Sequence, residues 1–319
     1  MQEKFYSSKY FKWVIKCAVS IFFVAYVIRK LDIYALWLNI KNYPVYLLIV
    51  ALLLMILNVL VGAVSLHALY KNESIWDMFA ITLKSSFYSL ILPGQLLGES
   101  TKILMMSSEK GKLSQRISAV FVDKLLNVYA LFVLGTVGSF FTKSIESKVI
   151  KLLFGISALG LTILGVIGSN VRSCTLIERK VDNSFASFPK LKNSLKKGIN
   201  IWIGYITDKK GMMISMLCGF IYHIIISLVY WVLARGLALH ISLLDIYWIN
   251  GLLTFILLFP ISIGGLGIRE VSLVGMLGLL EVRENIAFSL SLLILLVQVL
   301  RAMLGGVFII FGNINLKKS

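Results

Sequence analysis

Four charged side chains follow two breaks in otherwise apolar stretches of the sequence: Glu99, Lys102, Arg269 and Glu270. The first break lies in SLILPGQLLGESTKIL (89–104) and the second in LLFPISIGGLGIREVSLV (257–274). An ionisable side chain at the centre of a bilayer costs ~2.5–3.5 kcal/mol on insertion scales, so such residues persist where they are paired or solvated. If these stretches lie in a membrane, the four charges predict a polar site that pairs internally or binds an anion such as a lipid phosphate.

The breaks consist of residues that end helices and allow tight turns: Pro93, Gly94 and Gly98 in the first stretch, and Pro260, Gly264, Gly265 and Gly267 in the second. Proline cannot donate a backbone hydrogen bond, and glycine permits turns and close backbone approach. Non-helical backbone at membrane depth is tolerated only where it packs in protein or lines a wet cavity. We therefore expect a cavity between the two breaks, with the N–H groups of a new half-helix pointing into it after each one.

The spacing of the four charges limits how they can pair. Glu99 and Lys102 are three residues apart and can pair on one helix face. Arg269 and Glu270 are adjacent and cannot, so a pair between Arg269 and Glu99 is a hypothesis. The simpler alternative is that a glutamate in a first helical turn only complements the helix dipole.

Further polar residues lie inside apolar segments. Arg301 lies near the middle of one such segment, one turn after Gln298, and a midplane arginine should face the bundle interior, where it can hold a phosphate bidentately. Asp123 and Lys124 lie about one turn inside another, either as cavity residues or as an interfacial pair. Three more polar residues are expected to pack and hydrogen-bond within the bundle: Asn58, His223 and Asn250.

Composition places all these residues in a membrane protein. The chain has 319 residues, of which 58% are hydrophobic and only 15% charged, and several apolar runs approach the ~18 residues needed to cross a bilayer. Six segments are predicted to be full spans: 13–28, 45–69, 119–141, 149–169, 212–234 and 286–311. Two broken apolar regions, 78–106 and 246–280, are left over. We interpret 13–28 as an uncleaved span rather than a signal peptide, because no clear cleavage site follows it.

The basic residues predict the orientation of the spans. The net charge is +17, and segment 170–210 carries nine Lys/Arg against three acidic residues, so it should be cytoplasmic, as should 102–118 and both termini. Segment 236–245 has no Lys or Arg and should be outside, although three basic residues in 29–44 fit the scheme poorly. Each broken region then begins and ends on one side, the first in the cytoplasm and the second outside. Both must enter the membrane and return.

The predicted fold is therefore an all-α polytopic membrane protein with about six full transmembrane helices and two re-entrant helical hairpins. Span, hairpin and span occur in that order twice in one integral domain (1–319), at about 45–141 and about 212–311, in opposite orientations. The same order of elements in opposite orientations is typical of the inverted-topology repeats of transporters. The basic loop 170–210 should form surface helices at most. Three dispersed cysteines and three dispersed histidines predict no disulfide framework, metal site or cofactor.

These motifs resemble the lysylphosphatidylglycerol synthase transmembrane family over roughly 10–312. The residues that carry the resemblance are Pro93, Gly98, Glu99, Lys102, Asp123 and Lys124 in the first half, and Pro260, Gly264, Gly265, Leu266, Gly267, Arg269 and Glu270 in the second. Gln95 and Leu96 stand where the family pattern has more glycine. The resemblance implies a bacterial or archaeal inner-membrane protein that moves a lipid between leaflets, without the cytoplasmic lysine-transferring domain of its two-part relatives.

The function expected from these features is lipid translocation rather than catalysis. The expected partners are membrane lipids with an anionic or phosphate-bearing headgroup, with a homo-oligomer or a partner membrane protein also possible and no role for nucleic acid. Two alternatives stay open. One is a membrane-embedded transferase acting on a lipid-linked substrate, and the other is a transporter of polyprenyl phosphates or small solutes, which would share the same topology.

Overall fold

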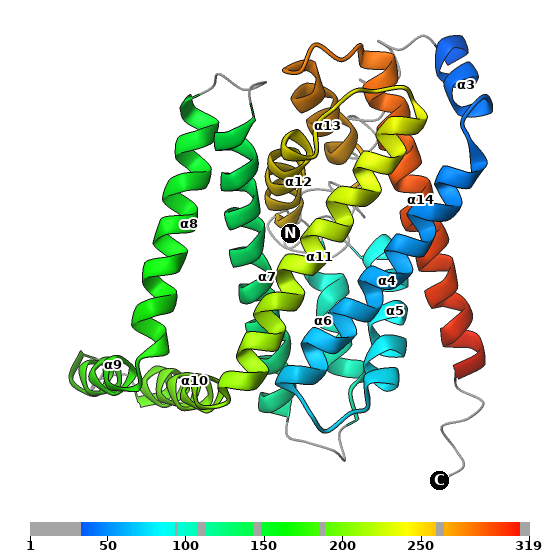
Figure 1. Ribbon diagram of the computed structural model, residues 1–319. Helices are drawn as coiled ribbons and strands as arrows, with labels where there is room; N and C mark the ends of the chain where they lie inside the picture. Colours follow the sequence, from blue (N-terminus) through cyan, green and yellow to red (C-terminus); the bar gives the residue numbers. More distant parts are fainter. Residues whose placement is uncertain are drawn as a thin grey trace, which may run out of the picture.

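The computed structural model describes residues 33–92, 95–107, 113–142, 148–184, 189–259 and 265–312, and within these ranges it is helical, with no strand (Figure 1). The helices are α3 (Ile33–Lys41), α4 (Val45–Leu69), α5 (Ile75–Ile91), α6 (Gln95–Met105), α7 (Leu113–Phe141), α8 (Lys148–Ser169), α9 (Val171–Ser184), α10 (Pro189–Thr207), α11 (Lys209–Gly236), α12 (Leu243–Leu258), α13 (Ile268–Gly278) and α14 (Glu284–Gly312). The predicted first span, 13–28, lies outside these residues, as do Pro93, Gly94, Pro260 and Gly264.

Five of the described helices are long and apolar enough to cross a membrane: α4, α7, α8, α11 and α14. They match the other five predicted spans, so the described part has the helices of a multi-pass membrane protein. Helix α7 begins at Leu113, six residues before the predicted 119. The prediction started too late because the first turns of the helix are polar and hydropathy does not detect them. Arg116 in those turns is buried, and its Nη1 donates to the carbonyls of Ile103 and Met106 at 3.1 and 2.7 Å, which satisfies the last carbonyls of α6.

Each broken apolar region forms two shorter helices that pack against each other, α5 with α6 and α12 with α13. At 1.5 Å per residue the longest of the four, α5, spans only about 26 Å, less than the ~30 Å of a hydrocarbon core. Figure 1 shows α5 and α6 in the lower half of the bundle and α12 and α13 in the upper half. The helix–break–helix structure of both regions is thus present in the fold.

Both broken regions begin with the same N-terminal cap. The hydroxyl of Ser74 accepts a hydrogen bond from the N–H of Asp77, and that of Ser242 accepts one from the N–H of Asp245, each at 3.1 Å. In both cases the aspartate bonds back to the serine N–H, which completes a capping box. These polar caps start α5 and α12 three residues before the predicted 78 and 246, which were drawn from hydropathy.

The helix contacts keep the same pattern when the two halves of the chain are exchanged. Helix α4 packs along α11, while α5 packs on α14 and α12 packs on α7. Within each half, α6 packs on α7 and α13 packs on α14. The pattern is unchanged when α4, α5, α6 and α7 are swapped for α11, α12, α13 and α14 in that order.

Glycines on the long helices permit the two equivalent contacts between halves. A Cβ on Gly138 of α7 would come within 2.5 Å of the carbonyl oxygen of Leu244, at the start of α12. A Cβ on Gly305 of α14 would collide with the carbonyl oxygen of Leu83 on α5. Both interfaces therefore depend on direct backbone approach, as is common between membrane helices.

The largest apolar core surrounds the second broken region. It includes fully or almost fully buried side chains from α12, α13 and α14, among them Trp248, Leu253, Leu273 and Ile294. Phe154 of α8 joins this core, filling the space beside Gly135 and Gly251. This packing holds α12 and α13 in place, so that polar residues on their other faces have defined positions.

Helices α9 and α10 form the basic segment 170–210 and lie across the lower ends of α8 and α11 (Figure 1). Asp208 ends this segment and caps α11, accepting from the N–H of Gly211 at 3.1 Å and from Lys71 Nζ at 2.6 Å. The Lys71 hydrogen bond, followed by that from Gly211, holds the pKa of Asp208 below its usual value. The end of α14 lies at the same end of the bundle, so segments predicted to share the cytoplasmic side lie together.

Candidate functional site

A cavity of about 140 Å³ lies among the helices of both halves of the chain. Its lining comes from α4, α5, α6, α7, α11, α12, α13 and α14. A water needs about 10–15 Å³ of such volume, so the cavity has room for several waters. It is thus large enough for the phosphate part of a headgroup but too small for a whole phospholipid.

Seven of the eight predicted site residues line this cavity: Glu99, Lys102, Asp123, Lys124, Arg269, Gln298 and Arg301. They come from four helices, and Glu99 and Arg301 are about two hundred residues apart in the chain. Glu270, the eighth, is not among the lining residues. The predicted juxtaposition of residues from both broken regions at one cavity is therefore present.

Glu99 and Lys102 form the ion pair that their spacing predicted, with 2.5 Å between Glu99 Oε2 and Lys102 Nζ. The Lys102 side chain is 8% exposed and that of Glu99 is 30% exposed. Helix α6 begins at Gln95, so the two residues lie one and two turns inside it rather than at its start, and this corrects the expected position. Glu99 thus has a partner within α6, and its pairing with Arg269 stays a prediction.

Asp123 is buried and belongs to a chain of hydrogen bonds that joins α7 to α4 and α11. One of its carboxylate oxygens accepts a hydrogen bond from the hydroxyl of Ser65 on α4, and that hydroxyl lies 2.8 Å from the hydroxyl of Ser215 on α11. The neighbouring Lys124 also lines the cavity. Of the two interpretations of this pair, the geometry favours cavity residues over an interfacial pair.

Lys124 and Arg301 are cations with no carboxylate within 4.0 Å among the described residues. Arg301 Nη1 lies 3.7 Å from the sulfur of Met55, a weak acceptor, and its buried Nε has no hydrogen-bond partner in the described part. The cavity is lined by four lysine or arginine side chains and two carboxylates, so its lining has two more positive than negative charges. An anion in the cavity would offset this excess.

The start of α13 shows separate roles for Arg269 and Glu270. Gly265 and Gly267 have φ angles of 78° and 83°, as the predicted turn requires. Glu270 Oε2 accepts the N–H of Gly267 at 2.5 Å, so Glu270 caps its own helix, which agrees with the simpler alternative for this residue. Arg269 is 2% exposed, and a Cβ on Gly265 would come within 3.1 Å of its Nη2. Arg269 thus packs against Gly265 just before its own helix and also lines the cavity.

Close approach between the two helices of the first hairpin depends on Gly98. A Cβ at this position would overlap with Ser89 on α5, as expected for a glycine of the first break. The carbonyl of Gly98 accepts hydrogen bonds from the hydroxyls of Ser85 at 3.0 Å and Thr101 at 2.6 Å. This contact places Glu99, the next residue, at the cavity.

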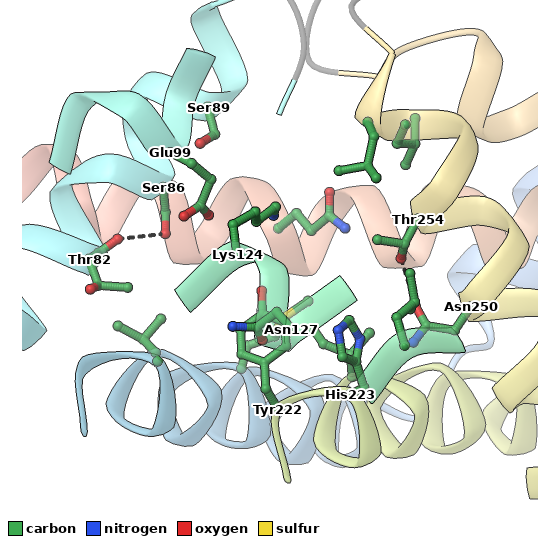
Figure 2. Close-up of a pocket in the computed structure, with 18 of the residues that line it drawn as sticks. Thr82, Ser86, Ser89, Glu99, Lys124, Asn127, Tyr222, His223, Asn250 and Thr254 are labelled. Atoms are coloured by element: carbon green, nitrogen blue, oxygen red, sulfur yellow. Dashed lines mark hydrogen bonds between the residues drawn. The ribbon is translucent and has the colours of Figure 1, made fainter. Parts of the chain in front are cut away.

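Several uncharged polar residues at the cavity were missed in the sequence: Thr82, Ser86, Ser89, Asn127, Tyr222 and Thr254. A signal for most of them exists, since polar residues recur at helical spacing within apolar helices. Thr82, Ser86 and Ser89 follow one face of α5, and Asn250 and Thr254 are four apart on α12. His223 was expected to pack in the core; it is buried, as expected, but it also lines the cavity (Figure 2).

The fold and the site define a class: a helical multi-pass membrane protein with a cationic cavity between two interrupted helical regions. Residues 13–306 match the model of the family described as the lysylphosphatidylglycerol synthase TM region. The chain therefore belongs to that family, as its motifs predicted. Neither a curated protein nor a solved structure gave a match.

Proposed function

We propose that this protein is a flippase-like lipid translocase of a bacterial or archaeal inner membrane, with both termini in the cytoplasm. The observation that carries the proposal is the cavity with four cationic and two acidic side chains, two cations of which have no carboxylate partner in the described part. Such a surface attracts an anionic headgroup, while the acyl chains of the lipid remain outside among lipids.

In this proposal the headgroup phosphate binds between Lys124 and Arg301. Arg301 presents a planar group of donors suited to a phosphate, and Gln298, one turn earlier, lines the same cavity. Lys124 supplies a second, more mobile charge from α7. Charge-assisted hydrogen bonds of this kind contribute about 1.5–3 kcal/mol each.

Alternating access follows from treating α5–α6 and α12–α13 as re-entrant hairpins that enter from opposite faces. The exchangeable helix contacts and the two identical capping boxes support an inverted-topology repeat, with repeat 1 at about 45–141 and repeat 2 at about 212–311. Each hairpin packs against a long helix of the other half, α5 against α14 and α12 against α7. Movement of one half against the other would therefore open the cavity to one side at a time.

The test is transport by the purified full chain in vesicles that contain acyl-labelled fluorescent phosphatidylglycerol, with dithionite bleaching the outer leaflet. Arg301→Gln should slow lipid movement by about tenfold or more, the loss expected for one charge-assisted hydrogen bond. Arg283→Gln, which changes an exposed arginine before α14, is the matched control and should leave the rate unchanged.

Two results would contradict the proposal. One is an equal rate for the wild type and Arg301→Gln. The other is covalent alteration of the lipid without a change in leaflet, which would favour the membrane-embedded transferase.

A further inference from the structure

The polar lining of the cavity is divided between two ends (Figure 2). Figure 2 shows Ser86, Ser89 and Glu99 toward one end, and Asn250 and Thr254 on α12 toward the other. Glu99 is paired with Lys102, and Figure 2 shows Lys124 near Glu99, so these charges belong to the first end. The labelled side chains toward the second end are uncharged polar groups, and the buried Arg269 also lines the cavity.

The uncharged end offers hydrogen-bonding groups that are weakly used. Asn250 is 1% exposed, and its bonds to Ser227 and Thr254 are long, at 3.4 and 3.3 Å. His223 is 5% exposed, and its Nδ1 has no hydrogen-bond partner in the described part of the chain. Buried polar groups normally have partners, so these groups point to a ligand that supplies them.

The chemistry of this end suits hydroxyl groups. Amide, imidazole and hydroxyl side chains can each exchange donor and acceptor roles with a ligand hydroxyl. An ammonium group is stabilised most by negatively charged acceptors, and both carboxylates of the cavity already have partners, Glu99 in Lys102 and Asp123 in Ser65. The excess of cationic side chains nearby would also repel it.

We propose that Asn250, Thr254 and His223 form a subsite for the hydroxyls of a neutral polyol attached to the phosphate. The substrate class is then an anionic lipid with a glycerol- or sugar-like headgroup, and not a lipid that bears an amino group. This inference rests on the proposed function, because it assumes that the phosphate binds at the charged end.

Binding by the purified full chain in uncharged detergent tests the subsite without requiring transport. The probes are short-chain phosphatidylglycerol, phosphatidylmethanol, which has the same charge but no hydroxyl, and phosphatidylethanolamine, measured by calorimetry. Phosphatidylglycerol should bind about fivefold to tenfold more tightly than phosphatidylmethanol, the effect of one or two neutral hydrogen bonds. Phosphatidylethanolamine should bind most weakly. Glycerol 3-phosphate and inorganic phosphate are then compared as competitors of phosphatidylglycerol. Stronger competition by glycerol 3-phosphate indicates recognition of the polyol headgroup, whereas equal competition indicates binding of any free phosphate.

Single-residue variants test which side chains cause the preference for phosphatidylglycerol over phosphatidylmethanol. Thr254→Val, which keeps the side-chain shape, should reduce the preference for phosphatidylglycerol and leave phosphatidylmethanol affinity unchanged, and His223→Phe should do the same. Thr162→Val on the exposed face of α8 is the control. Equal affinity for phosphatidylglycerol and phosphatidylmethanol, or tighter binding of phosphatidylethanolamine, would overturn the subsite and leave the translocase proposal intact. Preferential binding without any lipid movement would overturn the translocase and keep the subsite.

Discussion

At the scale of single residues, the structure separates side chains that sequence spacing had grouped. Arg269 and Glu270 were both predicted to face the cavity, yet Arg269 lines it and Glu270 caps α13. Arg301 was predicted to face the bundle interior, and Lys124 either to line the cavity or to belong to an interfacial pair. Both line the cavity, and neither has a carboxylate partner among the described residues. Which charge is available to a ligand depends on neighbours from other helices.

The capping role of Glu270 leads to a prediction about stability rather than binding. Glu270→Ala removes the acceptor of the Gly267 N–H and should cost about 1 kcal/mol, the usual effect of losing a helix cap, seen as a lower melting temperature in detergent. Glu270→Gln keeps an oxygen acceptor and should lose less. Unchanged melting of Glu270→Ala, together with lost anion binding, would instead assign Glu270 to the ligand.

At the scale of elements, short polar caps and glycines decide where helices begin and how closely they pack. The S-x-x-D boxes at Ser74 and Ser242 are visible in the sequence and mark the starts of α5 and α12 better than hydropathy does. The roles of Gly138 and Gly305 are not visible there, because a helix contact depends on a partner distant in the chain.

These two glycines provide matched tests of helix packing. Gly138→Ala and Gly305→Ala each place a Cβ against the backbone of a neighbouring helix and should destabilise the protein by about 1–3 kcal/mol. Gly160→Ala on α8 is the control, because no atom lies within 4 Å of its added Cβ. Thermal unfolding in detergent should therefore rank both test variants below the control, and equal melting of all three would contradict the packing described.

At the scale of the whole molecule, the exchangeable contacts and the position of the basic helices suggest opposite entry sides for the two hairpins. Lys71 and Arg179 belong to the end of the bundle that carries α9 and α10. His240 and Glu281 belong to connections at the other end, before α12 and after α13. The positive-inside rule predicts that the first end faces the cytoplasm.

Cysteine labelling tests this assignment. Single-cysteine variants Lys71→Cys, Arg179→Cys, His240→Cys and Glu281→Cys, with Cys17, Cys174 and Cys218 replaced, are treated with a membrane-impermeant maleimide. His240→Cys and Glu281→Cys should react in intact cells, while Lys71→Cys and Arg179→Cys should react only after permeabilisation. Reaction of Lys71→Cys and His240→Cys from the same side would contradict the inverted arrangement.

The sequence by itself determined the helical membrane class, the spans at 45–69, 119–141, 149–169, 212–234 and 286–311, and both interrupted regions. These depend on hydropathy, proline, glycine and charge, which act locally along the chain. Only the tertiary structure decided that Arg301 faces the same cavity as Glu99, that Asp123 binds Ser65, and that Asn250 and His223 line this cavity as well. Such contacts join residues far apart in sequence, and their geometry follows from the packing of whole helices.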